Sequence, residues 1–103
     1  MEFRNVTAHA KANVYFDGKV VSHAIVTASG EKKTLGVILP GSYHFGTDAP
    51  ELMEIVGGKC THLVDGTEEV IATEAGSSFN VPGKSGFTIT VAGEPCHYVC
   101  SFL

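Results

Sequence analysis

Apolar and polar residues alternate in short stretches along most of the chain, and each stretch ends at a cluster of turn residues. Alternation with a period of two is typical of a strand that buries one face, whereas a helix repeats its apolar positions every three or four residues. No window of the chain shows a sustained helical period with a capping residue at its start. The pattern therefore predicts an all-β protein.

The turn residues divide the chain into about eight to ten short strands. Asp17-Gly18 and Asp65-Gly66 are the strongest hairpin signals, because an Asp-Gly pair suits a two-residue turn. Pro-Gly and Gly-Gly pairs mark further breaks. We expect strands over residues 13–16, 19–22, 34–39, 42–47, 51–56, 60–64, 68–73, 78–81, 87–91 and 96–103.

Strands of this length and spacing are typical of a sandwich or a barrel. Small antiparallel domains protect their edges by closing into a barrel or by pairing two sheets as a jelly roll, as cupins do. We therefore predict a single cupin-type antiparallel β-barrel or jelly roll over residues 13–103, with a pocket lined from several strands. Residues 1–12 alternate less clearly and are expected to form an N-terminal arm or an edge strand.

The composition argues against several classes of function. The chain has 103 residues, 7 Lys plus Arg against 11 Asp plus Glu, and a net charge of -4. It offers no basic stripe to a nucleic-acid backbone, so we expect no nucleic-acid partner. Residues 1–11 lack the apolar run of a signal peptide, and no segment is apolar over the length of a bilayer. These features favour a cytoplasmic protein without membrane association.

The cysteines predict no cross-link. Cys60, Cys96 and Cys100 are an odd number and show no Cys-x-x-Cys spacing, which argues against a disulfide framework and a structural zinc site. We expect reduced, mostly buried thiols. The alternation of the last strand places Cys96, Tyr98, Cys100 and Phe102 on one face.

Two short motifs match the cupin pattern. Gly76-x5-Pro82 resembles the opening of the second cupin motif. Glu51, followed after six residues by Gly58, resembles the end of the first motif. The carboxylate of Glu51 therefore occupies the place of the glutamate that ordinary cupins use as a metal ligand.

The histidines of that metal site are missing. Metal-binding cupins hold a divalent ion with several imidazoles and one carboxylate. Counted from the two motifs, the histidine positions fall on Phe45, Thr47 and Phe87, and a count from Gly36 places one of them on His44. At most one imidazole survives in either register, so we expect no metal ligands and no cofactor.

A more specific pattern covers almost the whole chain from Asn13 onward. Its residues are Asn13-x-Tyr15-Phe16-x-Gly18-Lys19-Val20, Gly36-Val37, Pro40-Gly41-x-Tyr43-x-Phe45-x-Thr47, Pro50-Glu51-x-Met53, Ala75-Gly76-Ser77-x-Phe79-x-Val81-Pro82, Ser85-x-Phe87 and Tyr98-x-Cys100. In these positions the chain resembles the pyrimidine/purine nucleoside phosphorylase family, whose members are small single-domain cupins.

The resemblance implies an enzyme, a pentosyltransferase of broad specificity. Such an enzyme cleaves purine and pyrimidine nucleosides with phosphate, and it yields the free base and ribose 1-phosphate without a metal. The expected partners are then nucleosides and inorganic phosphate. Small cupins commonly pair, so we also expect a homodimer, and the strand over 96–103 is a candidate edge for a partner's sheet.

Phosphorolysis passes through a transition state with oxocarbenium character, so the site must hold phosphate, ribose and the departing base. Tyr43, Phe45 and Thr47 share one face of a strand, and Glu51 returns toward that face after a turn. We expect Glu51 and Thr47 to be catalytic, with Glu51 accepting from the ribose hydroxyls and Thr47 donating. Tyr43 or Phe45 would then pack on sugar or base. The alternative is two core aromatics and a solvent-exposed carboxylate.

Four more residues are candidates for substrate binding. Lys84 and Ser85 lie in a tight Pro-Gly-containing loop whose N–H groups, hydroxyl and ammonium suit an anion. A plain hairpin turn with a solvated lysine has the same composition. Phe79 and Phe87 bracket this loop, and they either stack on the base or fill the barrel.

Two alternatives remain open. In the opposite register of residues 42–47, His44 turns inward and can act as a general acid toward the leaving base, whereas a surface histidine is the simpler interpretation. A non-catalytic cupin that binds a sugar or a nucleoside would use the same Glu51, Thr47 and aromatic side chains. Dependence of base release on phosphate separates binding from phosphorolysis.

Overall fold

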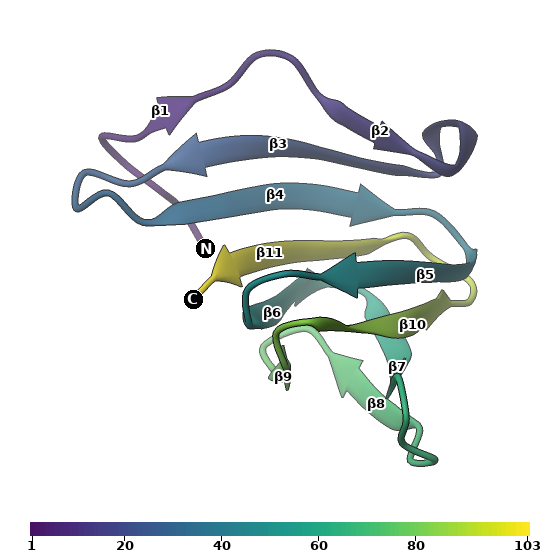
Figure 1. Cartoon of the computed structure of the whole chain (residues 1–103). Coiled ribbons are helices and arrows are strands. Elements are labelled where there is room, and N and C mark those ends of the chain that lie inside the picture. Colours follow the sequence, from purple (N-terminus) through teal and green to yellow (C-terminus); the bar gives the residue numbers. More distant parts are fainter.

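The computed structural model describes residues 1–103 as two antiparallel β-sheets that face each other (Figure 1). The chain has no helix long and apolar enough to cross a membrane. The elements are β1 (Thr7–Ala8), β2 (Asn13–Tyr15), the 3-10 turn η1 (Phe16–Gly18), β3 (Val20–Val26), β4 (Lys32–Ile38), β5 (Gly41–Thr47), β6 (Glu51–Gly57), β7 (Lys59–Val64), β8 (Ile71–Glu74), β9 (Ser78–Val81), β10 (Ser85–Val91) and β11 (Cys96–Phe102).

The two sheets exchange strands along the chain. The larger, seven-stranded sheet has the order β1-β3-β4-β11-β6-β9, with β2 also paired to β3, and the smaller sheet has the order β5-β10-β7-β8. From β4 onward, consecutive strands mostly alternate between the sheets, which is the connectivity of a jelly roll. The predicted all-β jelly roll is therefore confirmed.

Two turns differ from the hairpins that the sequence predicts. The Asp17-Gly18 pair lies in η1 instead of a two-residue turn, and Phe16 and Asp17 have φ angles of 52° and 55°. L-residues adopt this left-handed region only at a cost, so the local Asp-Gly signal is overridden by contacts that Phe16 makes elsewhere. The strand expected from residue 68 begins only at Ile71, because residues 65–70 form a longer exposed connection.

The core lies between the sheets and follows the alternation of the strands. On β9, for example, Phe79 and Val81 are buried while Ser78 and Asn80 are exposed. The most deeply buried side chains are Val20, Ile38, Ile55, Val81, Ile89 and Cys96. All three cysteines are buried free thiols, as predicted.

β11 lies inside the larger sheet. It pairs with β4 on one side and with β6 on the other, so it has no free edge. The expectation that this strand extends a partner's sheet is wrong, and a dimer would need another surface. The predicted shared face is correct, because Cys96, Tyr98 and Cys100 are buried on the inner side and Phe102 ends the row at 43% exposure.

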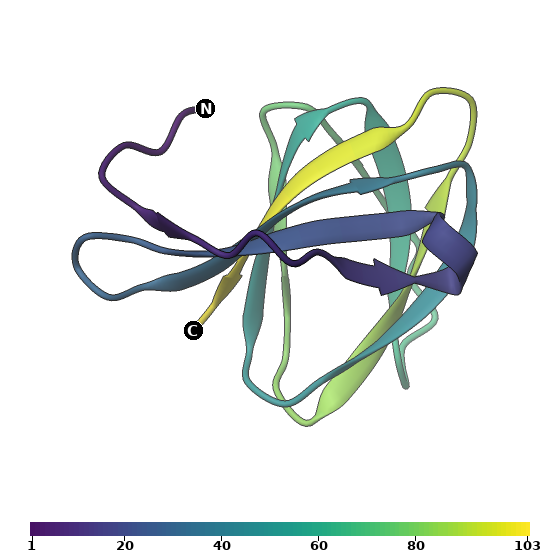
Figure 2. The same ribbon diagram turned by 90° about the horizontal axis from the view of Figure 1, so that it is seen from above.

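The larger sheet reaches farther than the smaller one. Seen from above, the hairpin between β3 and β4 projects beyond the space that the two sheets enclose (Figure 2). β1 pairs with the outer end of β3, where Thr7 lies opposite Val26. The inner face of this extension therefore borders the space between the sheets without being covered by the smaller sheet.

Candidate functional site

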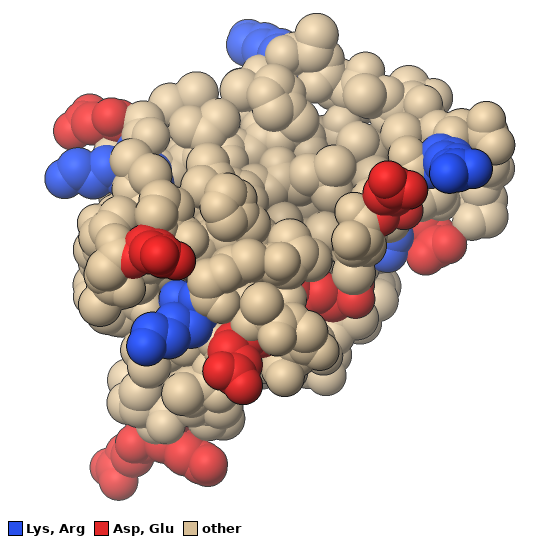
Figure 3. Space-filling model, turned by 180° about the vertical axis from the view of Figure 1, so that it is seen from behind, with Lys and Arg blue, Asp and Glu red and all other residues tan.

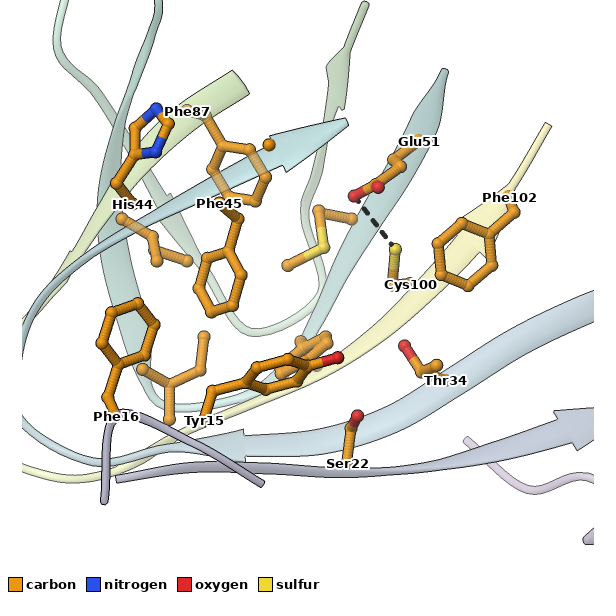
Figure 4. Close-up of a pocket in the computed structure, with 15 residues that line it drawn as sticks. Tyr15, Phe16, Ser22, Thr34, His44, Phe45, Glu51, Phe87, Cys100 and Phe102 are labelled. Carbon is orange, nitrogen blue, oxygen red and sulfur yellow. Dashed lines mark hydrogen bonds between the residues drawn. The ribbon is translucent and has the colours of Figure 1, made fainter. Parts of the chain in front are cut away.

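A cavity of about 380 Å³ lies between the two sheets (Figure 4). Tyr15, Phe16 and Phe102 stand at its rim and are 43–45% exposed. Strands of both sheets contribute to the lining, which is divided into an aromatic half and a polar half (Figure 4). This division decides which parts of a ligand each half can hold.

The aromatic half is built on Phe16, Phe45 and Phe87. The Phe45 and Phe87 rings are inclined by 29° with centroids 5.9 Å apart, and Phe16 meets Phe45 edge-on at 5.5 Å. The wall behind them is aliphatic and consists of Ile38, Met53 and Ile89. Flat apolar surfaces of this kind suit the faces of a heterocyclic base.

The polar half carries one carboxylate and several hydroxyl groups. Its residues are Tyr15, Ser22, Thr34, Glu51, Tyr98 and Cys100. Glu51 is the only acidic residue that lines the cavity, and no lysine or arginine lines it. The polar half therefore suits a neutral ligand that is rich in hydroxyl groups.

Glu51 is half-buried at the start of β6 and is held by one hydrogen bond. The Cys100 thiol donates to Glu51 Oε1 across 3.4 Å, and no other hydrogen bond to the carboxylate is present. Burial raises the pKa of Glu51 because the charged form loses hydration, and the bond from Cys100 partly opposes this shift. Glu51 Oε2 remains available to accept hydrogen bonds from a ligand.

Tyr98 forms part of the cavity wall because a glycine lies beneath its ring. A Cβ atom on Gly36 would lie only 2.6 Å from the Tyr98 ring. Burial raises the pKa of Tyr98 to about 12, and a hydrogen bond with Ser22 partly opposes this shift. Ser22 Oγ also accepts a hydrogen bond of 3.3 Å from Asn13 Nδ2, which ties β2 to the wall of the cavity.

β5 has the register in which Tyr43, Phe45 and Thr47 face inward, yet only Phe45 lines the cavity. The Tyr43 hydroxyl bonds to the carbonyl oxygens of Leu39 and Pro40, both at 2.9 Å. Its ring is therefore fixed in the core below the turn that precedes β5. The structure brings Phe45, Phe87 and Glu51 together, as the sequence interpretation expects.

Thr47 links β5 to the connection between β9 and β10. Its hydroxyl donates to the Pro82 carbonyl oxygen at 2.6 Å and accepts from the Ser85 N–H at 3.1 Å. Thr47 is 7% exposed and does not line the cavity. Its hydroxyl is therefore already paired within the chain.

Phe79, Lys84 and Ser85 also lie outside the cavity lining. Phe79 stacks on His62 with ring centroids 3.7 Å apart and helps to fill the core. Lys84 is exposed with a φ angle of 50°, and its N–H donates to the Asp48 carbonyl oxygen at 2.9 Å. At least two N–H groups of the candidate anion loop, those of Lys84 and Ser85, are thus used inside the chain.

His44 belongs to the opposite, outer face of β5 and touches only the rim of the aromatic half. Its Nε2 lies 2.8 Å from Asp65 Oδ2, a contact that links β5 to the connection after β7. The pair lies over Gly86, where a Cβ atom would come within 2.5 Å of the Asp65 carboxylate. The register with His44 inside the barrel is therefore not the one that the chain adopts.

Several cavity residues were not singled out from the sequence. Tyr15 and Phe16 enter the lining because η1 replaces a tight hairpin, and this turn has no local signal. Ser22 and Thr34 lie on strands that were expected, but only the pairing of β3, β4 and β11 brings them beside Tyr98. The available clues were the family pattern, which contains Tyr15-Phe16 and Tyr98-x-Cys100, and the shared face of Tyr98, Cys100 and Phe102.

No three side chains of His, Cys, Asp or Glu gather closely enough to hold a metal ion. Phe45 and Phe87, which stand where ordinary cupins carry histidines, contribute their rings to the aromatic half instead. Glu51 has Cys100 as its neighbour. The donor set around the motif glutamate thus differs from the imidazole-rich set of metal-binding cupins.

Comparison with known proteins identifies relatives over nearly the whole chain. The family model described as "Pyrimidine/purine nucleoside phosphorylase" matches residues 10–102. A protein of that name from Aromatoleum aromaticum is 57% identical over 101 residues, which is 98% of this chain and 94% of the relative.

Solved structures show the same fold. A protein of unknown function from Acinetobacter sp. ADP1 is 43% identical, with a TM-score of 0.95 over 99% of this chain and 98% of the other. An oxalate decarboxylase variant from Bacillus subtilis is 17% identical, with a TM-score of 0.69 over 87% of this chain and 27% of the other. The second likeness concerns the fold alone, and it supports the predicted cupin-type jelly roll.

Proposed function

Because this chain belongs to the pyrimidine/purine nucleoside phosphorylase family, we propose that it cleaves purine and pyrimidine nucleosides with inorganic phosphate and without a metal. The products are the free base and ribose 1-phosphate. The observation that carries the proposal is the division of a single cavity into an aromatic half and a polar half around Glu51.

The reaction exchanges one bond at C1′ for another. The C1′–N bond breaks and its electron pair stays on the base nitrogen, while a phosphate oxygen forms the new C1′–O bond. The proton of hydrogen phosphate ends on the base. The site must therefore stabilise positive charge at C1′ and negative charge on the departing base during the transfer.

The aromatic half is the base subsite in this proposal. Phe45 and Phe87 offer neighbouring ring faces, and Phe16 closes the side toward the rim. Stacking on aromatic rings tolerates different bases, because every base has a π face. A subsite built from apolar rings, without a set of donors and acceptors matched to one base, is consistent with broad specificity.

The polar half is the ribose subsite. Glu51 can accept hydrogen bonds from ribose hydroxyls through Oε2, while Cys100 holds Oε1. The hydroxyls of Tyr15, Thr34 and Tyr98 line the same region. A carboxylate beside the sugar also stabilises the positive charge that develops at C1′, most strongly where water is excluded.

Thr47 acts as a positioning residue. Its hydroxyl joins the end of β5 to the connection between β9 and β10, and this junction lies near the turn that leads to Glu51. Lys84 belongs to this connection, and Ser85 is the first residue of β10. We propose that Thr47, Lys84 and Ser85 hold the site in place and do not contact the substrate.

The test is release of free base by purified protein from uridine, cytidine, thymidine, adenosine, guanosine and inosine. Each nucleoside is incubated with and without phosphate, with and without a chelator, and the products are separated by chromatography. We expect several bases to appear only with phosphate, and we expect no effect of the chelator. A matched Glu51→Gln preparation reports any activity of a contaminating enzyme.

Three results would contradict the proposal. Base release without phosphate would indicate a hydrolase, and loss of activity with the chelator would remove the metal-free part. No release of any base would favour a binding protein. The absence of lysine and arginine from the cavity lining is the observation that supports this second candidate, because such a cavity can hold a neutral nucleoside without phosphate.

A further inference from the structure

A shallow groove adjoins the cavity at its polar end. It has a volume of about 410 Å³, and it shares Thr34 and Phe102 with the cavity lining. His9, Lys32 and Lys33 also line the groove, and no aspartate or glutamate does. The groove is thus a positively charged extension of a cavity whose only acidic residue is Glu51.

The strand register places Lys32 on the same face of the sheet as Glu51. Lys33 pairs with Ser101, so Lys32 at the start of β4 lies opposite Phe102, and Phe102 pairs with Glu51. Lys32, Phe102 and Glu51 therefore form one row across β4, β11 and β6. Two strand spacings correspond to about 10 Å between the Cα atoms of Lys32 and Glu51.

Lys32 and its neighbour Lys33 have different surroundings. Lys33 Nζ donates to Ser101 Oγ at 2.7 Å and lies 3.8 Å from Glu31 Oε2. The alternation of the strand turns Lys32 to the other face, the face on which Thr34 lines the cavity. Lys32 is exposed and makes no ion pair within the chain, so its ammonium group is free for a ligand.

The order of the three regions matches the geometry of a displacement at C1′. The aromatic half lies at one end, the polar half lies in the middle, and Thr34 and Phe102 lead to the groove (Figure 4). An attacking group and a leaving group occupy opposite sides of the carbon between them. With the base at the aromatic end and ribose at Glu51, the nucleophile must approach from the side of the groove.

We propose that this groove is the phosphate subsite and that Lys32 is its principal ligand. The inference rests on the proposed phosphorylase function. The ammonium group of Lys32 offsets the charge of phosphate beside the Glu51 carboxylate, and the Thr34 hydroxyl donates a further hydrogen bond. Phosphate held there stands next to the ribose subsite, and the phosphate of ribose 1-phosphate occupies the same place in the reverse reaction.

The back of the molecule offers no alternative basic surface to an anion (Figure 3). On that face lysine and arginine side chains are scattered among acidic ones and form no continuous basic surface (Figure 3). With a net charge of -4, the protein as a whole does not attract anions. Local positive charge at the groove therefore determines where phosphate binds.

The test compares Lys32→Gln and Lys32→Arg with the control Lys59→Gln. Lys59 is exposed at the start of β7 and lines neither the cavity nor the groove. Initial rates of uridine phosphorolysis are measured against phosphate concentration and, separately, against uridine concentration. We expect Lys32→Gln to raise the KM for phosphate at least about tenfold with little change in the KM for uridine, and we expect Lys32→Arg to restore most of the affinity.

A second readout does not require turnover. Phosphate that binds the native state should raise the midpoint of thermal unfolding in the wild type and in Lys59→Gln, with sulfate as the comparison anion. This stabilisation should be lost in Lys32→Gln. An effect of equal size in Lys32→Gln and Lys59→Gln would indicate a general charge effect and overturn the inference.

The two proposals fail in different ways. If the wild type is an active phosphorylase and Lys32→Gln has the same KM for phosphate, the proposed function stands and the groove is refuted as the phosphate subsite. Failure of the wild type to release base under any condition would refute the function. In that case the thermal unfolding experiment still tests the anion site. A rise in the unfolding midpoint with phosphate that disappears in Lys32→Gln supports the site, and no rise in the wild type rejects it.

Discussion

The Cys100 thiol and the Glu51 carboxylate are hydrogen-bonded across the boundary of β11 and β6, with 3.4 Å between Sγ and Oε1. Cys100 pairs with Met53, and Glu51 pairs with the next inward residue of β11, Phe102. The carboxylate is thereby held on the cavity wall with one oxygen unpaired. A thiol is a weak donor, so it offsets only part of the cost of burying Glu51, and the pKa of Glu51 is raised.

Replacement of Glu51 by Gln should separate stability from activity. A raised native pKa means that the contribution of Glu51 to stability is complete below its unfolded pKa, near 4.5, and is lost as the pH rises through the native pKa. Glu51→Gln should therefore raise the unfolding midpoint at pH 7 and lower base release at least about tenfold. The gain in midpoint should shrink at pH 4. A folded variant with wild-type activity would exclude Glu51 from the site.

Gly36→Ala should disturb Tyr98, because the new Cβ atom would lie 2.6 Å from the Tyr98 ring. Forcing a buried ring to move typically costs about 1–3 kcal/mol of unfolding free energy. Urea denaturation measures this loss. The control is Gly46→Ala, whose Cβ atom would meet nothing closer than 3.9 Å. Equal losses of unfolding free energy in the two variants would mean that the contact with Tyr98 is not what destabilises Gly36→Ala.

Thr47→Val should weaken the junction between β5 and the connection that follows β9. It removes the hydroxyl that donates to Pro82 and accepts from Ser85, and leaves buried polar groups unpaired. We expect Thr47→Val to lose about 1–3 kcal/mol of unfolding free energy. Thr47→Ser keeps the hydroxyl and should therefore keep most of the wild-type stability. Activity should fall in proportion to the loss of folded protein. Inactivity in a stably folded Thr47→Val would instead indicate direct contact with substrate.

His62 should make the fold sensitive to acid. It is 3% exposed, its Nδ1 has no hydrogen-bond partner, and burial lowers its pKa from an ordinary value of 6.5. With a lowered native pKa, the contribution of His62 to stability is complete above pH 6.5 and is lost as the pH falls through the native pKa. His62→Leu should therefore lose less stability between pH 7 and pH 5 than the wild type.

The control for His62 is a replacement of the exposed His97 by Gln, which removes a histidine that lies outside the core. Urea denaturation at both pH values measures the difference. If His62→Leu and the wild type show the same acid sensitivity, another group carries it.

Alternation alone was sufficient to predict most strands, because each strand buries one face against the opposite sheet. Alternation left two registers open for residues 42–47, and the burial pattern of β5 shows that Tyr43, Phe45 and Thr47 face inward. Alternation could not tell which inward side chains reach open space. Tyr43 and Thr47 face inward like Phe45, but their hydroxyls bond to backbone atoms outside the cavity lining.

The sequence by itself determined the all-β class, the family and the place of Glu51, since these depend on local alternation and on motifs that are continuous along the chain. The tertiary structure decided the rest of the cavity, because its lining comes from strands far apart in sequence. Thr34 reaches Cys100 only through the pairing of β4 with β11. Phe16 enters only because packing between the sheets maintains a turn with positive φ, which no short-range pattern specifies.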